Sequence, residues 1–213
     1  MIIDHAKTTL SENFIKDLHL TLKNGTSDSR KEWFVVGDYK KVPNEVGGMN
    51  TALPEEVPGR MKELLKEYNG KKEKTFEDIL DFHVRFERIH PFQDGNGRVG
   101  RLILFKECLK YNIVPFIIDD PLKMFYYRGL KEWDYERGYL MDTCLSAQDK
   151  YKAYLDYFRI AYENNQIEID EYTVIEVSDQ TCFGNYAVIE GKEYPTEIVY
   201  DFCRIFFKLD SIL

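Results

Sequence analysis

The fold is decided by one short polar stretch, His90-Pro91-Phe92-Gln93-Asp94-Gly95-Asn96-Gly97-Arg98-Val99-Gly100-Arg101. It holds an imidazole, a carboxylate, a glycine-rich turn and two arginines. Residues 75–89 before it repeat apolar side chains at the spacing of a buried helix, and residues 102–112 after it do the same. Thr75 followed by Asp78 predicts a cap at the start of the first helix. We therefore expect a polar loop held between two core helices.

The loop has the features of an anion site. Pro91 disfavours helical geometry at His90, so the first helix should end there and present the imidazole. Gly95, Asn96 and Gly97 are types that tolerate positive φ, so successive backbone N–H groups can point into one concavity. If the second helix begins near Asn96, its unpaired N–H groups and the positive end of its dipole face the same concavity.

The side chains of the loop indicate the chemistry. Arg98 and Arg101 add forked donors suited to phosphate oxygens. Asp94 would be repelled by phosphate unless a cation such as Mg²⁺ bridges them. His90 is mostly neutral at pH 7 and can accept a proton. The spacing predicts phosphoryl or nucleotidyl transfer to a hydroxyl group, and a turn whose Asp and Arg side chains only cap helices is the structural alternative.

The stretch from His90 to Arg101 matches every position of H-x-F-x-[DE]-G-N-G-R-x-x-R, the signature of the Fic family. The chain therefore resembles proteins that mostly transfer AMP from ATP to a Ser, Thr or Tyr hydroxyl of a target protein. The resemblance implies a mainly α fold, a Fic-domain helical bundle with a β-hairpin flap, over residues 1–163. Residues 164–213 would be a short C-terminal extension of unknown role with β character.

The same resemblance assigns roles by position. His90 would be the base that deprotonates the target hydroxyl, and Asp94 would be the Mg²⁺ ligand. The positions that would hold the phosphates of ATP are Gly95, Asn96, Gly97, Arg98 and Arg101. Arg101 would reach the terminal phosphate. The related Doc branch, which phosphorylates its target, lacks the glycine found here at Gly97, so Gly97 favours AMP transfer.

Residues 33–53 are the expected flap. Trp33–Val36 is a β-prone run, Val46-Gly47-Gly48-Met49 is a turn candidate, and Asn50–Leu53 is the expected returning strand. In the Fic fold a hairpin at this place pairs with the target backbone and lays its hydroxyl residue near the catalytic histidine. A surface hairpin without function is the alternative.

A regulatory motif is suggested near the start of the chain. Many Fic proteins are silenced by a helix carrying [ST]-x-x-x-E-[GN], and the six residues from Thr8 match this pattern. The resemblance would make Thr8 and Glu12 inhibitory, with Glu12 pairing with Arg101. The alternative is an ordinary entry into a helix over residues 11–24, capped by Ser11.

Three more helices are expected: one opened by Pro54 and Pro58 and closed by Gly70, one beginning at Pro121, and one over residues 135–162. Aromatic residues 125–127 could line an adenine pocket or pack in the core. His83 lies seven residues before His90 on the same helix face. We expect a hydrogen-bonded core histidine there, because no third metal ligand is in view and Mg²⁺ prefers oxygen. In the extension we expect strands over residues 167–177 and 184–191, whereas residues 198–209 fit either a strand or a helix.

Composition limits the partners. The chain of 213 residues carries a formal charge of −8 and is 44% hydrophobic. This balance argues against a general nucleic-acid or membrane binder, and no apolar run is long enough to cross a bilayer. The four widely spaced cysteines fit free thiols, so we expect a cytoplasmic protein. A homo-oligomer is compatible with the sequence.

The expected function is protein adenylyltransferase activity with ATP and Mg²⁺ on a protein target, and on the chain itself. Removal of AMP from a modified protein, or transfer of another nucleotide, would use the same loop. An interaction module that holds a nucleotide without turnover is the alternative of another class.

Overall fold

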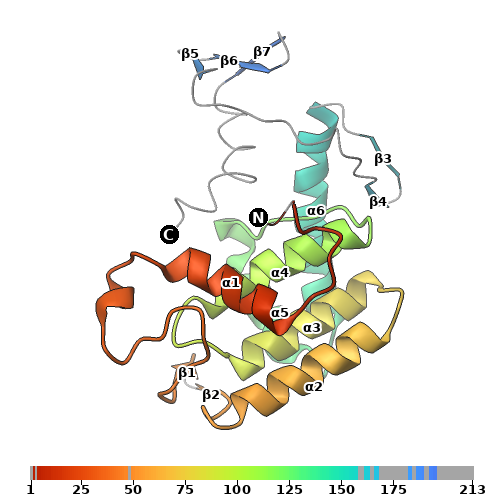
Figure 1. Ribbon diagram of the computed structural model, residues 1–213. Helices are drawn as coiled ribbons and strands as arrows, with labels where there is room; N and C mark the ends of the chain where they lie inside the picture. Colours follow the sequence, from red (N-terminus) through yellow and green to blue (C-terminus); the bar gives the residue numbers. More distant parts are fainter. Residues whose placement is uncertain are drawn as a thin grey trace.

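The computed structural model describes residues 2, 4–47, 49–157, 161–163, 166–167, 182–183, 186–189 and 192–195. The main body is helical, as the sequence predicts (Figure 1). Its helices are α1 (Glu12–Lys23), α2 (Val57–Gly70), α3 (Phe76–Ile89), α4 (Asn96–Lys110), α5 (Lys123–Glu132) and α6 (Gly138–Tyr157). Short 3₁₀ turns occupy Asp28–Arg30 and Asp120–Leu122. None of the helices in these ranges is long and apolar enough to cross a membrane.

Helix α3 begins and ends where the sequence predicts. Thr75 and Asp78 form a capping box: the Thr75 N–H donates to Asp78 Oδ2 at 2.8 Å, and the Asp78 N–H donates to Thr75 Oγ1 at 3.2 Å. The helix ends at Ile89, and His90 takes the left-handed conformation, with φ 51° and ψ 62°. Pro91 explains this end, because it disfavours right-handed helical geometry at the residue before it.

Helix α4 is the central helix of the body (Figure 1). It begins at Asn96, directly after Gly95, whose φ is 84°. Apolar side chains such as Val99, Ile103 and Leu104 are buried on several of its faces, because α1 packs on one side and α3 on another. The polar loop 90–95 is therefore held between two core helices, as expected.

Helices α1 and α2 complete the core beside α3 and α4. Ser11 Oγ accepts the Phe14 N–H at 3.2 Å and caps α1, so the helix begins where the sequence predicts. The expected apolar face of α2 is buried: Val57, Met61, Leu64, Leu65 and Tyr68. These faces share one hydrophobic core with α3 and α4.

The hairpin is shorter than predicted. Its strands are β1 (Glu45–Val46) and β2 (Met49–Asn50), with Val46 opposite Met49, so the predicted turn is correct. The strand predicted at Trp33–Val36 is wrong. This segment forms turns, and Phe34 packs on the His19 ring with ring centroids 6.1 Å apart. Phe34 covers α1, whereas Trp33 is half exposed.

Part of the C-terminal extension has β structure. Strand β3 (Tyr162–Glu163) pairs antiparallel with β4 (Gln166–Ile167). Strands β5 (Cys182–Phe183), β6 (Tyr186–Ile189) and β7 (Lys192–Pro195) form an antiparallel sheet in that order. The predictions over residues 168–177 and 198–209 lie outside the described residues.

Candidate active site

His90 is held as a proton acceptor. Its Nδ1 lies 3.2 Å from the backbone carbonyl oxygen of Glu87, in the last turn of α3. A carbonyl only accepts, so Nδ1 carries the proton and donates, which leaves Nε2 as the basic nitrogen. Burial lowers the pKa of His90 below its ordinary value, so the imidazole is neutral at physiological pH.

Phe92 and Asn96 fix the shape of the loop. The Phe92 side chain is fully buried and stacks on the His19 ring at 4.0 Å, with the two planes 2° apart. Asn96 Oδ1 accepts the Phe92 N–H at 2.7 Å, and Asn96 Nδ2 donates to the Phe92 carbonyl at 2.7 Å. The Asn96 side chain therefore braces the loop, and its backbone N–H is what the helix start offers to an anion.

The expected anion site coincides with one left-handed residue and a helix start. Of the three loop positions that tolerate positive φ, Gly95 has it, whereas Asn96 and Gly97 lie in the first turn of α4. The N–H groups of this first turn have no partners within the helix, and they carry its positive dipole end. Gly95 is also pressed against α1, because a Cβ there would lie 3.1 Å from Leu22 Cδ2.

Asp94 is paired with two cations. Its Oδ2 lies 2.7 Å from Lys23 Nζ and 3.1 Å from Arg98 Nη2. Partial burial raises the pKa of Asp94, but the hydrogen bond from Lys23 and the charges of Lys23 and Arg98 outweigh it and hold the pKa below its ordinary value. The side chain is 52% exposed, so the carboxylate is ionised and accessible.

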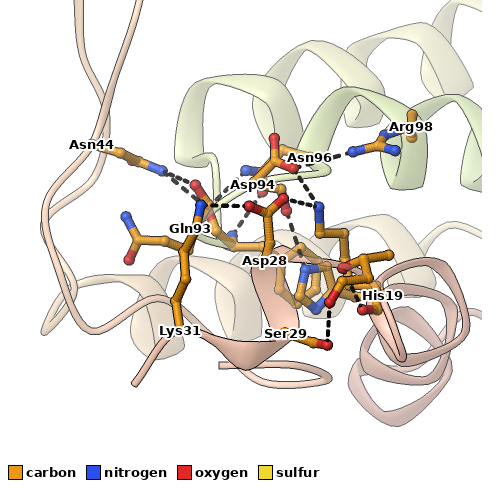
Figure 2. A network of polar contacts seen from close by, with 12 residues as sticks. His19, Asp28, Ser29, Lys31, Asn44, Gln93, Asp94, Asn96 and Arg98 are labelled. Atoms are coloured by element: carbon orange, nitrogen blue, oxygen red, sulfur yellow. Dashed lines mark hydrogen bonds and ion pairs between the residues drawn. The ribbon is translucent and has the colours of Figure 1, made fainter. Parts of the chain in front are cut away.

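Two residues of helix α1 contact the loop at Asp94, and the sequence did not predict these contacts. Lys23 is buried and also contacts Asp28 Oδ2 at 2.7 Å. Figure 2 shows Asp28 and His19 in the same network of polar contacts as Asp94. His19 Nδ1 accepts the Gly37 N–H at 3.0 Å, so its Nε2 carries the proton and donates to the Asp94 carbonyl at 3.1 Å. In the sequence these two residues look like ordinary members of an amphipathic helix.

A second polar cluster lies between α3 and α4. His83 is buried and its Nε2 lies 2.6 Å from the Tyr126 hydroxyl, which confirms the expected core histidine. Next to it, burial raises the pKa of Glu87 to about 7, and Glu87 Oε1 has no hydrogen-bond partner in the described part of the chain. Gly100 makes room for this pair, since a Cβ there would overlap Glu87 Oε1.

Arg101 lies on this α3 side of α4. A Cβ at Gly97 would lie 3.2 Å from Arg101 Nη1, so the guanidinium stands beside the helix start. It also interacts with the Tyr126 hydroxyl. Arg98, through its pair with Asp94, and Arg101, next to Gly97, thus both lie near the start of α4, where an anion is expected.

The suggested inhibitory residues lie elsewhere. Glu12 Oε1 pairs with Lys16 at 2.9 Å, one turn further along α1. The Thr8 hydroxyl donates to the His5 carbonyl at 2.8 Å. Among the described residues, the structure therefore does not bring Glu12 to Arg101, and the regulatory role of Thr8 and Glu12 stays a prediction.

The hairpin is joined to the loop at its base. Asn44 Nδ2 donates to the Phe92 carbonyl at 3.0 Å, and the Val42 N–H donates to Gln93 Oε1 at 3.3 Å. Val46 is 43% exposed at the tip, which also includes Gly47, with φ 58°. Gly48 lies outside the described residues. Val46 is therefore exposed at the tip, while the foot of the hairpin is fixed to the loop that carries His90.

Comparison with known proteins agrees with this arrangement. A model of the Fic/DOC family matches residues 9–107. The protein adenylyltransferase fic-1 of Caenorhabditis elegans is 30% identical over 88 residues, which cover 40% of this chain and 17% of that protein. The protein adenylyltransferase Fic of Drosophila grimshawi is 25% identical over 137 residues, 61% of this chain and 28% of that protein. The chain thus spans less than a third of these two curated relatives.

The fold also matches a solved structure. A Fic-domain-containing signalling protein from Bacteroides thetaiotaomicron superposes with a TM-score of 0.54 at 30% sequence identity. The match covers 74% of this chain and 62% of that one.

Proposed function

The chain belongs to the Fic/DOC family, and from this premise we propose that it is a protein adenylyltransferase. It transfers AMP from ATP to a Ser, Thr or Tyr hydroxyl of a protein target, and to its own chain. The observation that carries the proposal is the neutral His90, fixed through Nδ1 to its own helix and carried on the loop that leads into the N-terminus of α4. Gly97 in the first turn of α4 favours AMP transfer over phosphorylation.

In this reaction the target hydroxyl oxygen forms a bond to the α-phosphorus of ATP, and the bond between the α-phosphorus and pyrophosphate breaks. His90 Nε2 takes the hydroxyl proton. The N–H groups at the start of α4, with Arg98 and Arg101, hold the phosphates and balance the charge that develops on them. Because Asn96 ties the loop to Phe92, these donors are in place before substrate binds, and positioning supplies much of the acceleration.

Asp94 fits a magnesium site. Its carboxylate is ionised and half exposed at the edge of the anion site. In the described part of the chain, no three acidic, histidine or cysteine side chains cluster as metal ligands. Mg²⁺ commonly takes one carboxylate, phosphate oxygens and waters, so Asp94 together with bound ATP would complete the ligand set. There the ion would neutralise phosphate charge.

The β1–β2 hairpin is the proposed docking place for the target. Its exposed tip and short strands support pairing with an extended peptide, by strand addition. We expect the reaction to take place in the cytoplasm, where Cys108 and Cys144, both free and buried, would stay reduced.

Two variants test this division of roles. Asp94→Ala should weaken Mg-ATP binding, because the metal loses its protein ligand. His90→Ala should bind Mg-ATP nearly as well as wild type but lose AMP transfer. Isothermal titration with Mg-ATP measures binding, and label from α-labelled ATP measures transfer. Equal loss of nucleotide binding in both variants would contradict the proposal.

A further inference from the structure

Lys40 is a buried lysine that has no acidic partner among the residues that the structure describes. Its side chain is 3% exposed, and in the described residues its ammonium contacts neutral oxygens. Lys40 Nζ donates to Asn44 Oδ1 at 2.6 Å, to Thr51 Oγ1 at 2.7 Å, and to the Ile89 carbonyl at 3.5 Å. Burying a cation without a counter-ion is unfavourable, so packing alone does not explain why a lysine occupies position 40.

The contacts of Lys40 join two functional elements. Asn44 directly precedes β1 and Thr51 directly follows β2, so the ammonium closes the base of the hairpin. Its third acceptor, the Ile89 carbonyl, belongs to the last residue of α3, next to His90. The Lys40 N–H also donates to the Pro91 carbonyl at 2.9 Å. One residue thus connects the hairpin base to the backbone on both sides of His90.

The position of the charge also matters. A cation at a helix C-terminus interacts favourably with the last carbonyl groups, and a buried charge is poorly screened by salt. The groups that face His90 are Lys40, Glu87, whose Oε2 is 4.0 Å from His90 Nδ1, and Asp94. Lys40 is the cation among these three, and it disfavours a second positive charge on the imidazole.

We propose that Lys40 is a positioning residue that fixes the docking hairpin to the catalytic loop and keeps His90 in its neutral, proton-accepting form. This inference rests on the proposed function and adds to it a link between the target-docking hairpin and the proton acceptor His90. Lys40 itself does not touch the reacting atoms in this account. It acts through Ile89, Asn44 and Thr51.

The first test does not depend on catalysis. In the full chain, NMR titration of the His90 ring protons is compared for wild type, Lys40→Met and Lys41→Met. Lys41 is the neighbouring, exposed lysine and serves as the matched control. We expect the His90 titration midpoint to rise by about 1 pH unit in Lys40→Met and to stay within about 0.2 units in Lys41→Met.

Two further variants separate charge from packing. Lys40→Arg keeps the charge and should restore the wild-type midpoint. Lys40→Gln removes the charge but keeps a hydrogen-bond donor, so it should raise the His90 midpoint as Lys40→Met does. If Lys40→Met does not fold, Lys40→Gln takes its place in the comparison. The same His90 midpoint in wild type and in folded Lys40→Gln would overturn the proposal.

Transfer assays give a second readout. Lys40→Met should lower kcat for label transfer from α-labelled ATP roughly tenfold. The KM for ATP should stay within about twofold of wild type, because the phosphate site is untouched. The acid limb of the pH profile should move with the NMR midpoint. If wild type transfers no label, the proposed function fails, whereas the NMR comparison still decides the role of Lys40.

Discussion

Lys23 Nζ lies 2.7 Å from Asp94 Oδ2, so the last residue of α1 forms an ion pair with the acidic residue of the loop. The two ends differ in exposure: the Lys23 side chain is 4% exposed and that of Asp94 is 52% exposed. The lysine is therefore fixed in the core and holds a carboxylate that reaches solvent. Helix α1 shapes the proposed metal ligand from outside the sequence motif.

Replacing Lys23 with Met keeps the apolar stem and removes the charge. Asp94 retains Arg98, so we expect the protein to fold with its free energy of unfolding lowered by about 1–2 kcal/mol. Affinity for Mg-ATP should fall about tenfold, because the carboxylate is no longer held and one cation is lost beside the phosphates. Denaturant unfolding and nucleotide titration measure the two effects.

The control for Lys23 is Lys31→Met. Lys31 pairs with Asp28 and not with Asp94, at a half-exposed position. The affinity of Lys31→Met for Mg-ATP should stay within about twofold of wild type, because the variant loses only an exposed ion pair. Equal nucleotide affinities for the Lys23 and Lys31 variants would show that the Asp94 pair does not shape the site.

The pH profile of transfer should report His90. Burial lowers the pKa of His90 below 6.5, so the basic form persists down to mildly acidic pH. The transfer rate should be flat near pH 7 to 8 and fall as pH drops through the lowered pKa. A midpoint of the acid limb at or above pH 7, with Mg-ATP binding unchanged, would contradict a buried His90 base.

Glu87 should make stability depend on pH. Its pKa is raised by burial to about 7 in the folded protein, so its favourable contribution is complete below the unfolded pKa near 4.5 and is lost as pH rises through 7. Glu87→Gln removes this titration. We expect the free energy of unfolding of Glu87→Gln to equal or fall below that of wild type at pH 5. Relative to wild type, it should rise by on the order of 2 kcal/mol between pH 5 and pH 8.

Denaturant unfolding at the two pH values measures the change for Glu87. Burial also lowers the pKa of neighbouring His83, to about 3, but that residue is present in both proteins and its effect cancels in the difference. A difference between variant and wild type that is the same at pH 5 and pH 8 would mean that Glu87 ionises normally.

Gly100 should resist substitution. In Gly100→Ala the new Cβ would overlap Glu87 Oε1 and lie 3.0 Å from His83 Cε1, and both side chains are confined between α3 and α4. We expect a loss of about 1–3 kcal/mol of unfolding free energy. The matched control is Gly59→Ala in α2, where no atom lies within 4 Å of the new Cβ and a gain of about 0.5 kcal/mol is expected. Equal changes in unfolding free energy for the two variants would argue against close packing of Glu87 and His83 on Gly100.

The parts of the fold that follow from local chemistry could be predicted. Thr75 and Asp78 start α3, Pro91 ends it, and Gly95 lets the chain turn into α4. Each of these signals acts within a few residues. The family motif then supplies the expected roles of the loop residues.

The parts that depend on distant partners could not be predicted. Lys23 and Asp94 are 71 positions apart, and Lys40 and Ile89 are 49 apart, so no local pattern marks them as pairs. The strand expected at Trp33–Val36 is wrong for a related reason. Strand propensity is decided by neighbours, and Phe34 packs against His19 and the Lys23 ammonium instead.

The most direct test of the central claim is incubation of the purified chain with ATP labelled at either the α- or the γ-phosphate, with and without His90→Ala. We predict label on protein from the α-phosphate alone, and its loss in His90→Ala. Label from the γ-phosphate alone would instead mean kinase chemistry. Bound ATP with no label from either position would contradict adenylyl transfer and favour removal of AMP or a nucleotide-holding role.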